Sequence, residues 1–269
     1  MPVMTVNGDD FGLNERNSKA IAAAFARGCI TDTTMLANGA WFEEAVALAR
    51  RQGFLDKIGI HLNLTEGVPL TAAVRRCPRF VTDGRFNKAY DRAEPLTAAE
   101  EAAVYAELTA QAERLRQAGI AVTHADSHHH MHTWAFTAPV ALRVCREQGI
   151  RAVRAHRNLG QFAIAGEAFN RGLAAQGFAA TRYFAYAADI AGGSIPDSTE
   201  VMVHPDYDAN GVLIDRRGRE NGVPTGAPLP DFHADPNIQF KSFAEVASVL
   251  PLAANGTAYI QGGTHNADN

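Results

Sequence analysis

The stretch VNGDDFG, residues 6–12, determines how the chain begins to fold. Residues 3–6 are mostly apolar and predict a short buried strand, and the carboxylates of Asp9 and Asp10 come soon after it. Two neighbouring carboxylates at the end of a buried strand repel each other and are costly to desolvate. The pair therefore indicates a bound cation or, because a helix follows shortly, carboxylates that cap a helix N-terminus.

Alternating strand and helix patterns extend outward from this first strand. Residues 14–28 have a helical composition that ends at Gly28, and residues 29–38 are rich in β-branched residues and predict a second strand. An amphipathic helix over residues 41–53 and a third strand over residues 57–64 continue the order. This β-α-β-α-β order predicts a parallel sheet with helices packed outside it.

The same alternation continues along the rest of the chain. Thr97 and Glu100 form a capping box at the start of a helix over residues 96–119. Further strands are predicted at residues 120–127, 150–155, 180–187, 199–205 and 257–261, and further helices at 135–149, 166–177 and 242–254. About seven β-α steps favour the α/β class, with a closed or nearly closed barrel first and a doubly wound open sheet second.

We expect one domain over residues 1–269, with two excursions from the repeating pattern. A length of 269 residues is within the range of a single α/β barrel. Prolines and glycines interrupt residues 63–96, and five of the twelve prolines lie within residues 205–240. Both segments are therefore predicted to be loop-rich.

Composition and charge exclude several classes of protein. Lys and Arg (25) are outnumbered by Asp and Glu (29), and there is no basic run, so no nucleic-acid footprint is expected. No apolar run is long enough to span a bilayer, and the start MPVMTVNGDD lacks the pattern of a secretion signal. Three widely separated cysteines indicate reduced thiols in a cytoplasmic protein. Base rates for enzymes of this size leave a homodimer open.

Candidate functional residues gather at the ends of the predicted strands. Asp9 and Asp10 follow the first strand, His61 lies near the end of the third, and His204 ends the strand over residues 199–205. The segment THADSHHHMH, residues 123–132, contains five of the ten histidines. In a β/α barrel the carboxyl ends of the strands converge on the face that carries the active site. We therefore expect these residues to meet in space.

Histidine and aspartate together indicate a divalent metal. Imidazole and carboxylate groups suit Zn²⁺ and other first-row metals, and a catalytic site typically offers three protein ligands and a position for water. One aspartate and two histidines would fill that requirement. One member of the Asp9–Asp10 pair would then bind the cation, and the other would stay free as a general base. Adjacent histidines cannot all face one metal, so at most two or three of the five would do so.

Five motifs resemble, in order, those of the YdjC-like carbohydrate deacetylases, which include chitooligosaccharide deacetylases. They are VNGDDFGLNERNSKAI, GCITDTTMLANG, IGIHLNLTEGVPLT, THADSHHHMH and EVMVHP. The likeness is strong over residues 3–72 and 120–155, and the chain departs from the family pattern from residue 205 onward. The resemblance implies a distorted, TIM-like (β/α) barrel with one divalent metal ion, which removes N-acetyl groups from amino sugars.

The resemblance also implies roles for individual residues. It identifies Asp10, His61 and His128 as metal ligands and Asp9 as the catalytic base. By similarity to the wider polysaccharide deacetylases, His204 is expected to be the acid that protonates the leaving amine.

Four further residues are expected to bind substrate or to support the ligands. Asp126, two residues before His128, is expected to orient a ligand histidine. Arg154 is expected to hold the catalytic aspartate ionised or to contact sugar hydroxyls. His130 is expected to line the site, and His132 stays open as a further ligand if a helix starts at His128.

Three other functions fit part of the pattern. A metal-dependent phosphoesterase also uses Asp/His sites, but a two-metal site would need more carboxylates than are available here. A Mg²⁺-dependent receiver domain has an acidic pair after its first strand, but it is much shorter and has no use for the histidines. A non-catalytic sugar-binding relative would not need all the catalytic residue types. The leading prediction is a metal-dependent hydrolase, with Zn²⁺ or Mg²⁺ as cofactor and a small N-acetylated carbohydrate as partner.

Overall fold

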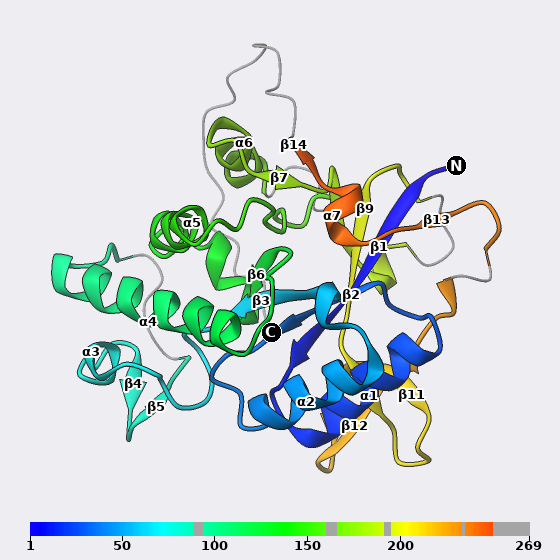
Figure 1. Cartoon of the computed structure of the whole chain (residues 1–269), viewed down its shortest axis with the longest axis horizontal. Coiled ribbons are helices and arrows are strands. Elements are labelled where there is room, and N and C mark those ends of the chain that lie inside the picture. Colours follow the sequence, from blue (N-terminus) through cyan, green and yellow to red (C-terminus); the bar gives the residue numbers. More distant parts are fainter. Residues whose placement is uncertain (89–93, 160–165, 191–194, 233–234, 250–269) are drawn as a thin grey trace.

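The computed structural model describes residues 1–88, 94–159, 166–190, 195–232 and 235–249, with a parallel sheet at their centre (Figure 1). The strand order of this sheet is β6-β3-β2-β1-β9-β8. Its strands are β1 (Val3–Phe11), β2 (Asp32–Met35), β3 (Ile58–Leu62), β6 (Ala125–Ser127), β8 (Tyr183–Tyr186) and β9 (Thr199–Val203), and β13 (Gln239–Phe240) pairs in parallel with the start of β1. The α/β class is therefore confirmed.

The order of the strands shows how the sheet curls. Strands β1, β2, β3 and β6 lie side by side in the order of the sequence, and β9, from much later in the chain, lies on the other side of β1. Past β6, isolated parallel bridges join Ala125 to Val153 and Ala152 to Ala179, which is in β7 (Ala179–Ala180). The ladders of the described residues thus make a curled half-barrel, and they do not include the complete ring of a full TIM barrel. The strand predicted over residues 150–155 is reduced to these two bridges.

The longer helices lie around the strands (Figure 1). They are α1 (Glu15–Ala26), α2 (Phe42–Gln52), α4 (Ala98–Gln117), α5 (Ala138–Glu147) and α6 (Glu167–Ala175). The side chain of Asn14 caps the start of α1, and the predicted capping box of Thr97 and Glu100 is present on α4. Gly53 ends α2 with φ of 76°, a left-handed conformation that favours glycine. One buried apolar cluster joins these helices to the sheet.

The two predicted excursions have different structures. Residues 63–96 leave the repeating pattern as expected, with a short α3 (Ala72–Arg75) and a hairpin of β4 (Val81–Thr82) and β5 (Arg85–Phe86). Most of residues 205–228 instead form an antiparallel sheet of β10 (Pro205–Tyr207), β11 (Leu213–Glu220) and β12 (Val223–Pro228). Prolines are tolerated there because Pro205 begins β10 and Pro224 lies on β12, which pairs on one side with β11.

The last described elements follow this antiparallel sheet. Helix α7 (Phe243–Val246) is shorter than the helix predicted over residues 242–254, and β14 (Ser248–Val249) pairs antiparallel with β7. The strand predicted over residues 257–261 lies outside the described residues. Within the described ranges, none of the helices combines the length and the hydropathy that a membrane crossing requires.

A buried carboxyl group ties α7 to the sheet. Asp32 Oδ2 accepts hydrogen bonds from Thr5 Oγ1 at 2.9 Å and from the main-chain N–H of Phe243 at 2.8 Å. Its other oxygen, Oδ1, is buried without a hydrogen-bond partner. Burial raises the pKa of Asp32 to about 6, although hydrogen bonds from Thr31, Phe243 and Thr5 oppose the shift. The folded protein therefore carries a buried charge at neutral pH.

Replacing Asp32 with asparagine is expected to stabilise the protein at high pH. The pKa of Asp32 is higher in the folded protein than in the unfolded chain. The contribution of Asp32 to stability is therefore greatest below about pH 4, where Asp32 is protonated in both states, and it is lost as the pH rises through about 6. At about pH 8, Asp32→Asn should increase the free energy of unfolding by about 1–3 kcal/mol. Urea unfolding at about pH 8 and about pH 4.5 checks this, because the gain should fall to about a third at the lower pH. An equal gain at both values would contradict the buried charge as its cause.

Candidate functional site

A β-bulge in β1 turns both neighbouring aspartates toward the same place. The pairing of β1 with β2 shifts between Gly8, opposite Thr33, and Phe11, opposite Met35, so β1 contains one extra residue. Asp10 has φ of 75°, a left-handed conformation that costs a non-glycine residue about 1–3 kcal/mol. In a regular strand, consecutive side chains point to opposite faces. Here β1 continues through both carboxylates, where the sequence predicted that they would follow the strand.

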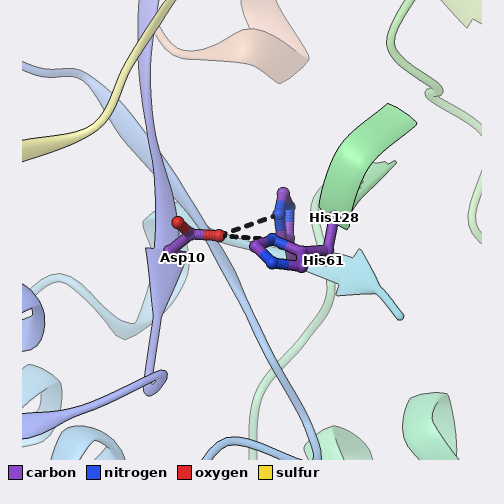
Figure 2. Close-up of side chains that lie close together, drawn as sticks. All are labelled: Asp10, His61 and His128. Atoms are coloured by element: carbon purple, nitrogen blue, oxygen red, sulfur yellow. Dashed lines mark ion pairs between the residues drawn. The ribbon is translucent and has the colours of Figure 1, made fainter. Parts of the chain in front are cut away.

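The structure brings together Asp10, His61 and His128, the predicted ligands. Asp10 Oδ1 lies 3.2 Å from His61 Nε2 and 2.8 Å from His128 Nδ1, and all three side chains are buried. Figure 2 shows both imidazoles turned toward this one carboxylate oxygen. Oδ1 is nevertheless a buried atom whose neighbours do not meet hydrogen-bond geometry. Three donor atoms that converge in this way fit a divalent metal ion of the Zn²⁺ type.

In each of these imidazoles, the ring nitrogen that points away from Asp10 contacts another carboxylate. Asp126 Oδ1 lies 2.7 Å from His61 Nδ1, and Thr34 Oγ1 donates a hydrogen bond to Asp126 Oδ2 at 3.0 Å. Glu66 Oε2 lies 3.0 Å from His128 Nε2. A carboxylate on the outer nitrogen fixes the tautomer and orientation of a ligand histidine and raises its basicity. The site thus has the layered arrangement of a metal centre.

The electrostatic field at this group favours positive charge. Burial alone would lower the pKa of His61, but Asp126, Asp10 and Asp9 raise it to about 10. Burial also opposes charge on His128, yet Asp10 and Glu66 raise its pKa. The imidazoles take up protons readily because several carboxylates surround them. A bound cation would satisfy the same field.

Asp9 belongs to a second buried network, centred on Arg154. The guanidinium nitrogens Nη1 and Nη2 each donate to an oxygen of Asp9 at 2.7 Å, and Nη1 also lies 2.6 Å from Asp126 Oδ2. Arg154 Nε donates to Glu200 Oε1 at 2.7 Å. Burial alone would raise the pKa of Asp9, but Arg154 holds it well below its usual range. Asp9 is therefore ionised at every physiological pH.

One of the carboxyl groups around Arg154 is neutral. Burial, only partly offset by Arg154, raises the pKa of Glu200 to about 8. Glu200 therefore carries a proton at neutral pH, and the guanidinium faces the ionised carboxylate of Asp9 and the carboxyl group of Asp126. Through these two residues, Arg154 connects Asp9 to the carboxylate that orients His61.

The histidine-rich segment distributes its side chains in several directions. Residues His128–Thr133 form a 3₁₀ turn in which His129 and His130 have φ of 53° and 54°. His132 lies 2.6 Å from Ser127 Oγ through Nδ1 and 3.2 Å from the carbonyl oxygen of Arg154 through Nε2. Both of its ring nitrogens thus have protein partners away from Asp10. No α-helix starts at His128, so the i, i+4 arrangement that would make His132 a ligand is absent from the turn.

The remaining predicted residues, His130 and His204, have hydrogen-bond partners outside the Asp10 group. His130 Nε2 is 2.9 Å from the Tyr186 hydroxyl at the end of β8. His204 is half-buried directly after β9, and its main-chain N–H donates to Asp215 Oδ1 at 2.9 Å. His204 contributes to lowering the pKa of both Asp9 and Asp10.

The sequence analysis did not identify four of the residues that support the site, namely Thr34, Glu66, Glu200 and Arg216. Arg216 Nη2, from β11, donates to Asp10 Oδ2 at 3.1 Å. Glu66 lies five residues after His61, within the motif IGIHLNLTEGVPLT. A carboxylate so close to a candidate ligand in the sequence could have been predicted to support the site. Arg216 carried no such signal, because its approach depends on the antiparallel sheet.

Glu66→Ala is expected to weaken metal binding by about 10- to 100-fold. The change leaves His128 Nε2 without the carboxylate that orients the ring. Competition with a chromophoric chelator measures the affinity. Glu66→Gln is the matched control, because its amide oxygen still accepts a hydrogen bond and should retain most of the affinity. Equal affinities in the alanine variant and the unmodified protein would show that Glu66 does not orient His128.

The fold and the site together define an α/β protein with a candidate mononuclear Asp-His-His metal centre at the carboxyl ends of its parallel strands. Residues 3–231 match the model of the YdjC-like protein family, and the chain belongs to that family. It is 31% identical over 257 residues to a carbohydrate deacetylase of Brevibacillus brevis, covering 90% of this chain and 99% of that protein. It is 35% identical over 218 residues to a chitooligosaccharide deacetylase of Klebsiella pneumoniae, covering 76% and 82%.

A solved structure shares the fold at lower sequence similarity. It is a crystal structure from Enterococcus faecalis V583, described as a candidate cellobiose-phosphate cleavage protein. The TM-score is 0.62 at 24% sequence identity, and the match covers 78% of this chain and 83% of that one. This likeness concerns the arrangement of helices and strands alone.

Proposed function

We propose that this protein is a metal-dependent carbohydrate deacetylase that removes N-acetyl groups from an amino sugar or a short N-acetylated oligosaccharide. The observation that carries the proposal is the convergence of Asp10 Oδ1, His61 Nε2 and His128 Nδ1. The names of the family relatives, carbohydrate deacetylase and chitooligosaccharide deacetylase, supply the reaction and the substrate class. The catalytic unit in this proposal is a single domain built on a distorted barrel.

In this proposal Asp10, His61 and His128 hold one divalent ion, with Zn²⁺ or Mg²⁺ as the first candidates. The ion would lower the pKa of a water molecule toward about 7 and polarise the acetyl carbonyl. Asp126 and Glu66 keep the two imidazoles oriented, because each contacts the outer nitrogen of one ring.

The proposed proton transfers use residues outside the ligand group. Asp9 takes the proton of the attacking water, and Arg154 keeps the carboxylate ionised and fixed in orientation. His204 donates a proton to the departing amine from its half-buried position directly after β9. His130, with its Tyr186 partner, forms part of the wall that faces the sugar.

The compartment is part of the same proposal. Cys29, Cys77 and Cys145 are free thiols, which is the usual state of cysteines in a reducing cytoplasm. A cytoplasmic enzyme of this kind would act on small sugars that have already entered the cell.

The deciding experiment is acetate release from di-N-acetylchitobiose. The protein is stripped with chelator and then resupplied with single divalent metals, and an aryl phosphate is assayed in parallel. Acetate release that chelator abolishes and metal restores is the expected result, with no phosphate release. Metal-restored phosphate release without acetate would assign a phosphoesterase instead. Tight metal binding with neither product would refute this substrate and direct the search to other N-acetylated sugars.

A further inference from the structure

We propose that Arg216 is a positioning residue that leaves Asp10 a single oxygen with which to bind a metal ion. This inference rests on the metal centre of the proposed function. The two oxygens of Asp10 have different surroundings: Oδ1 faces His61 Nε2 and His128 Nδ1, whereas Oδ2 accepts a hydrogen bond from Arg216 Nη2 at 3.1 Å. One oxygen of the Asp10 carboxylate thus faces the two histidines, and the other is hydrogen-bonded to the guanidinium of Arg216.

The fold fixes the guanidinium of Arg216 in place. The main-chain N–H of Arg216 donates to the carbonyl oxygen of His204 at 2.9 Å, so β11 is held against the end of β9. Arg216 Nη1 lies 3.8 Å from Asp206 Oδ2, and the side chain is only 19% exposed. Asp206 is itself buried and accepts a hydrogen bond from Arg16 Nε at 2.8 Å. Arg216 is therefore held between two buried carboxylates.

This division has chemical consequences for a bound ion. A carboxylate can bind a metal through one oxygen or through both. With Oδ2 engaged by Arg216, Asp10 offers Oδ1 alone, which leaves more positions for water and substrate. The guanidinium also repels a nearby divalent cation and draws electron density from the carboxylate. Arg216 thus lowers the metal affinity of the site, leaves coordination positions free for water and substrate, and makes the bound ion a stronger electron acceptor.

The sign of the effect separates this role from a merely structural one. If Arg216 only kept Asp10 in place, its removal would weaken metal binding. If it restricts Asp10 to one oxygen, its removal frees Oδ2, ends the repulsion and tightens binding. The two interpretations therefore predict opposite changes in the same measured affinity.

The test is titration of chelator-stripped protein with Zn²⁺ and with Co²⁺ by calorimetry, comparing Arg216→Gln with the unmodified chain. We expect Zn²⁺ to bind about tenfold more tightly or better to Arg216→Gln. The visible absorption of the Co²⁺ protein should weaken, because a second Asp10 oxygen raises the coordination number. Arg216→Met, which keeps the aliphatic stem, carries the same expectation should Arg216→Gln fold poorly.

Arg219→Gln is the matched control. Arg219 is on the same strand, lies 3.6 Å from Asp206 Oδ2 and donates to the carbonyl oxygen of Gly222, so the variant loses the same charge away from Asp10. Its Zn²⁺ affinity should stay within about twofold of the unmodified protein. Unchanged or weaker Zn²⁺ binding in both Arg216 variants would overturn the inference. Failure of the unmodified protein to bind either metal would overturn the proposed metal centre, and the inference with it.

Discussion

Asp9→Asn is expected to lower turnover by about 10²- to 10⁴-fold while the protein keeps its metal ion. Asp9 lies outside the Asp10–His61–His128 group, and both of its oxygens accept hydrogen bonds from Arg154 at 2.7 Å. An asparagine at this position is uncharged and cannot take a proton from water. The measurement is the rate of acetate release, with metal content determined by elemental analysis on the same preparation.

Asp10→Ala is the contrasting variant. It removes the oxygen that faces His61 and His128, so metal and turnover should be lost together. Near-normal turnover in Asp9→Asn would show that Asp9 is not the base. Loss of metal from Asp9→Asn would instead show that Asp9 supports metal binding, directly or through Arg154 and Asp126.

The Asp9→Asn variant is expected to fold, because a neighbouring group can replace the lost charge. Glu200 has a pKa of about 8 and holds its proton beside Arg154 while Asp9 is ionised. Without the charge of Asp9, the guanidinium lowers the pKa of Glu200 and allows it to ionise. Arg154 then still faces two carboxylates.

The sequence predicted the parallel sheet and the convergence of Asp10, His61 and His128 because both depend on local patterns. Strand and helix alternate along the chain, and parallel strands that follow one another place their carboxyl ends at one edge. Asp10, His61 and His128 each lie at such an end, and so does Asp126, which contacts His61 as expected. The order of strands and helices along the chain is therefore enough to predict that these residues lie close together.

The parts that were missed depend on tertiary pairing. The bulge that keeps Asp9 and Asp10 inside β1 shows only in the pairing with β2, and Arg154, which compensates the charge of Asp9, is 145 residues away from it along the chain. The antiparallel sheet was predicted as loop because prolines on an edge strand cannot be distinguished locally from prolines in a turn. Arg216 reaches Asp10 only through that sheet, at a separation of 206 residues. No local period or motif contains such information.

Arg154→Met is expected to lower the free energy of unfolding by about 3–5 kcal/mol. The side chain is fully buried, with its guanidinium 4.8 Å above the ring of Phe184. Its removal leaves the carboxylates of Asp9 and Asp126 buried without their cation. Methionine fills much of the volume, so the loss reflects uncompensated charge rather than a cavity. Urea unfolding followed by circular dichroism measures the change.

A double variant identifies charge as the cause. Arg154→Met combined with Asp9→Asn removes one of the two uncompensated charges, and it should be more stable than Arg154→Met alone by about 1–3 kcal/mol. The surface control is Arg116→Met, which breaks an exposed ion pair with Glu113 and should change the stability far less than Arg154→Met. If the double variant were less stable than Arg154→Met, lost packing rather than unpaired charge would explain the effect. If Arg154→Met cost no more than Arg116→Met, Asp9 would be able to take up a proton in the folded state, and Arg154 would be required to keep the base ionised rather than to keep the protein folded.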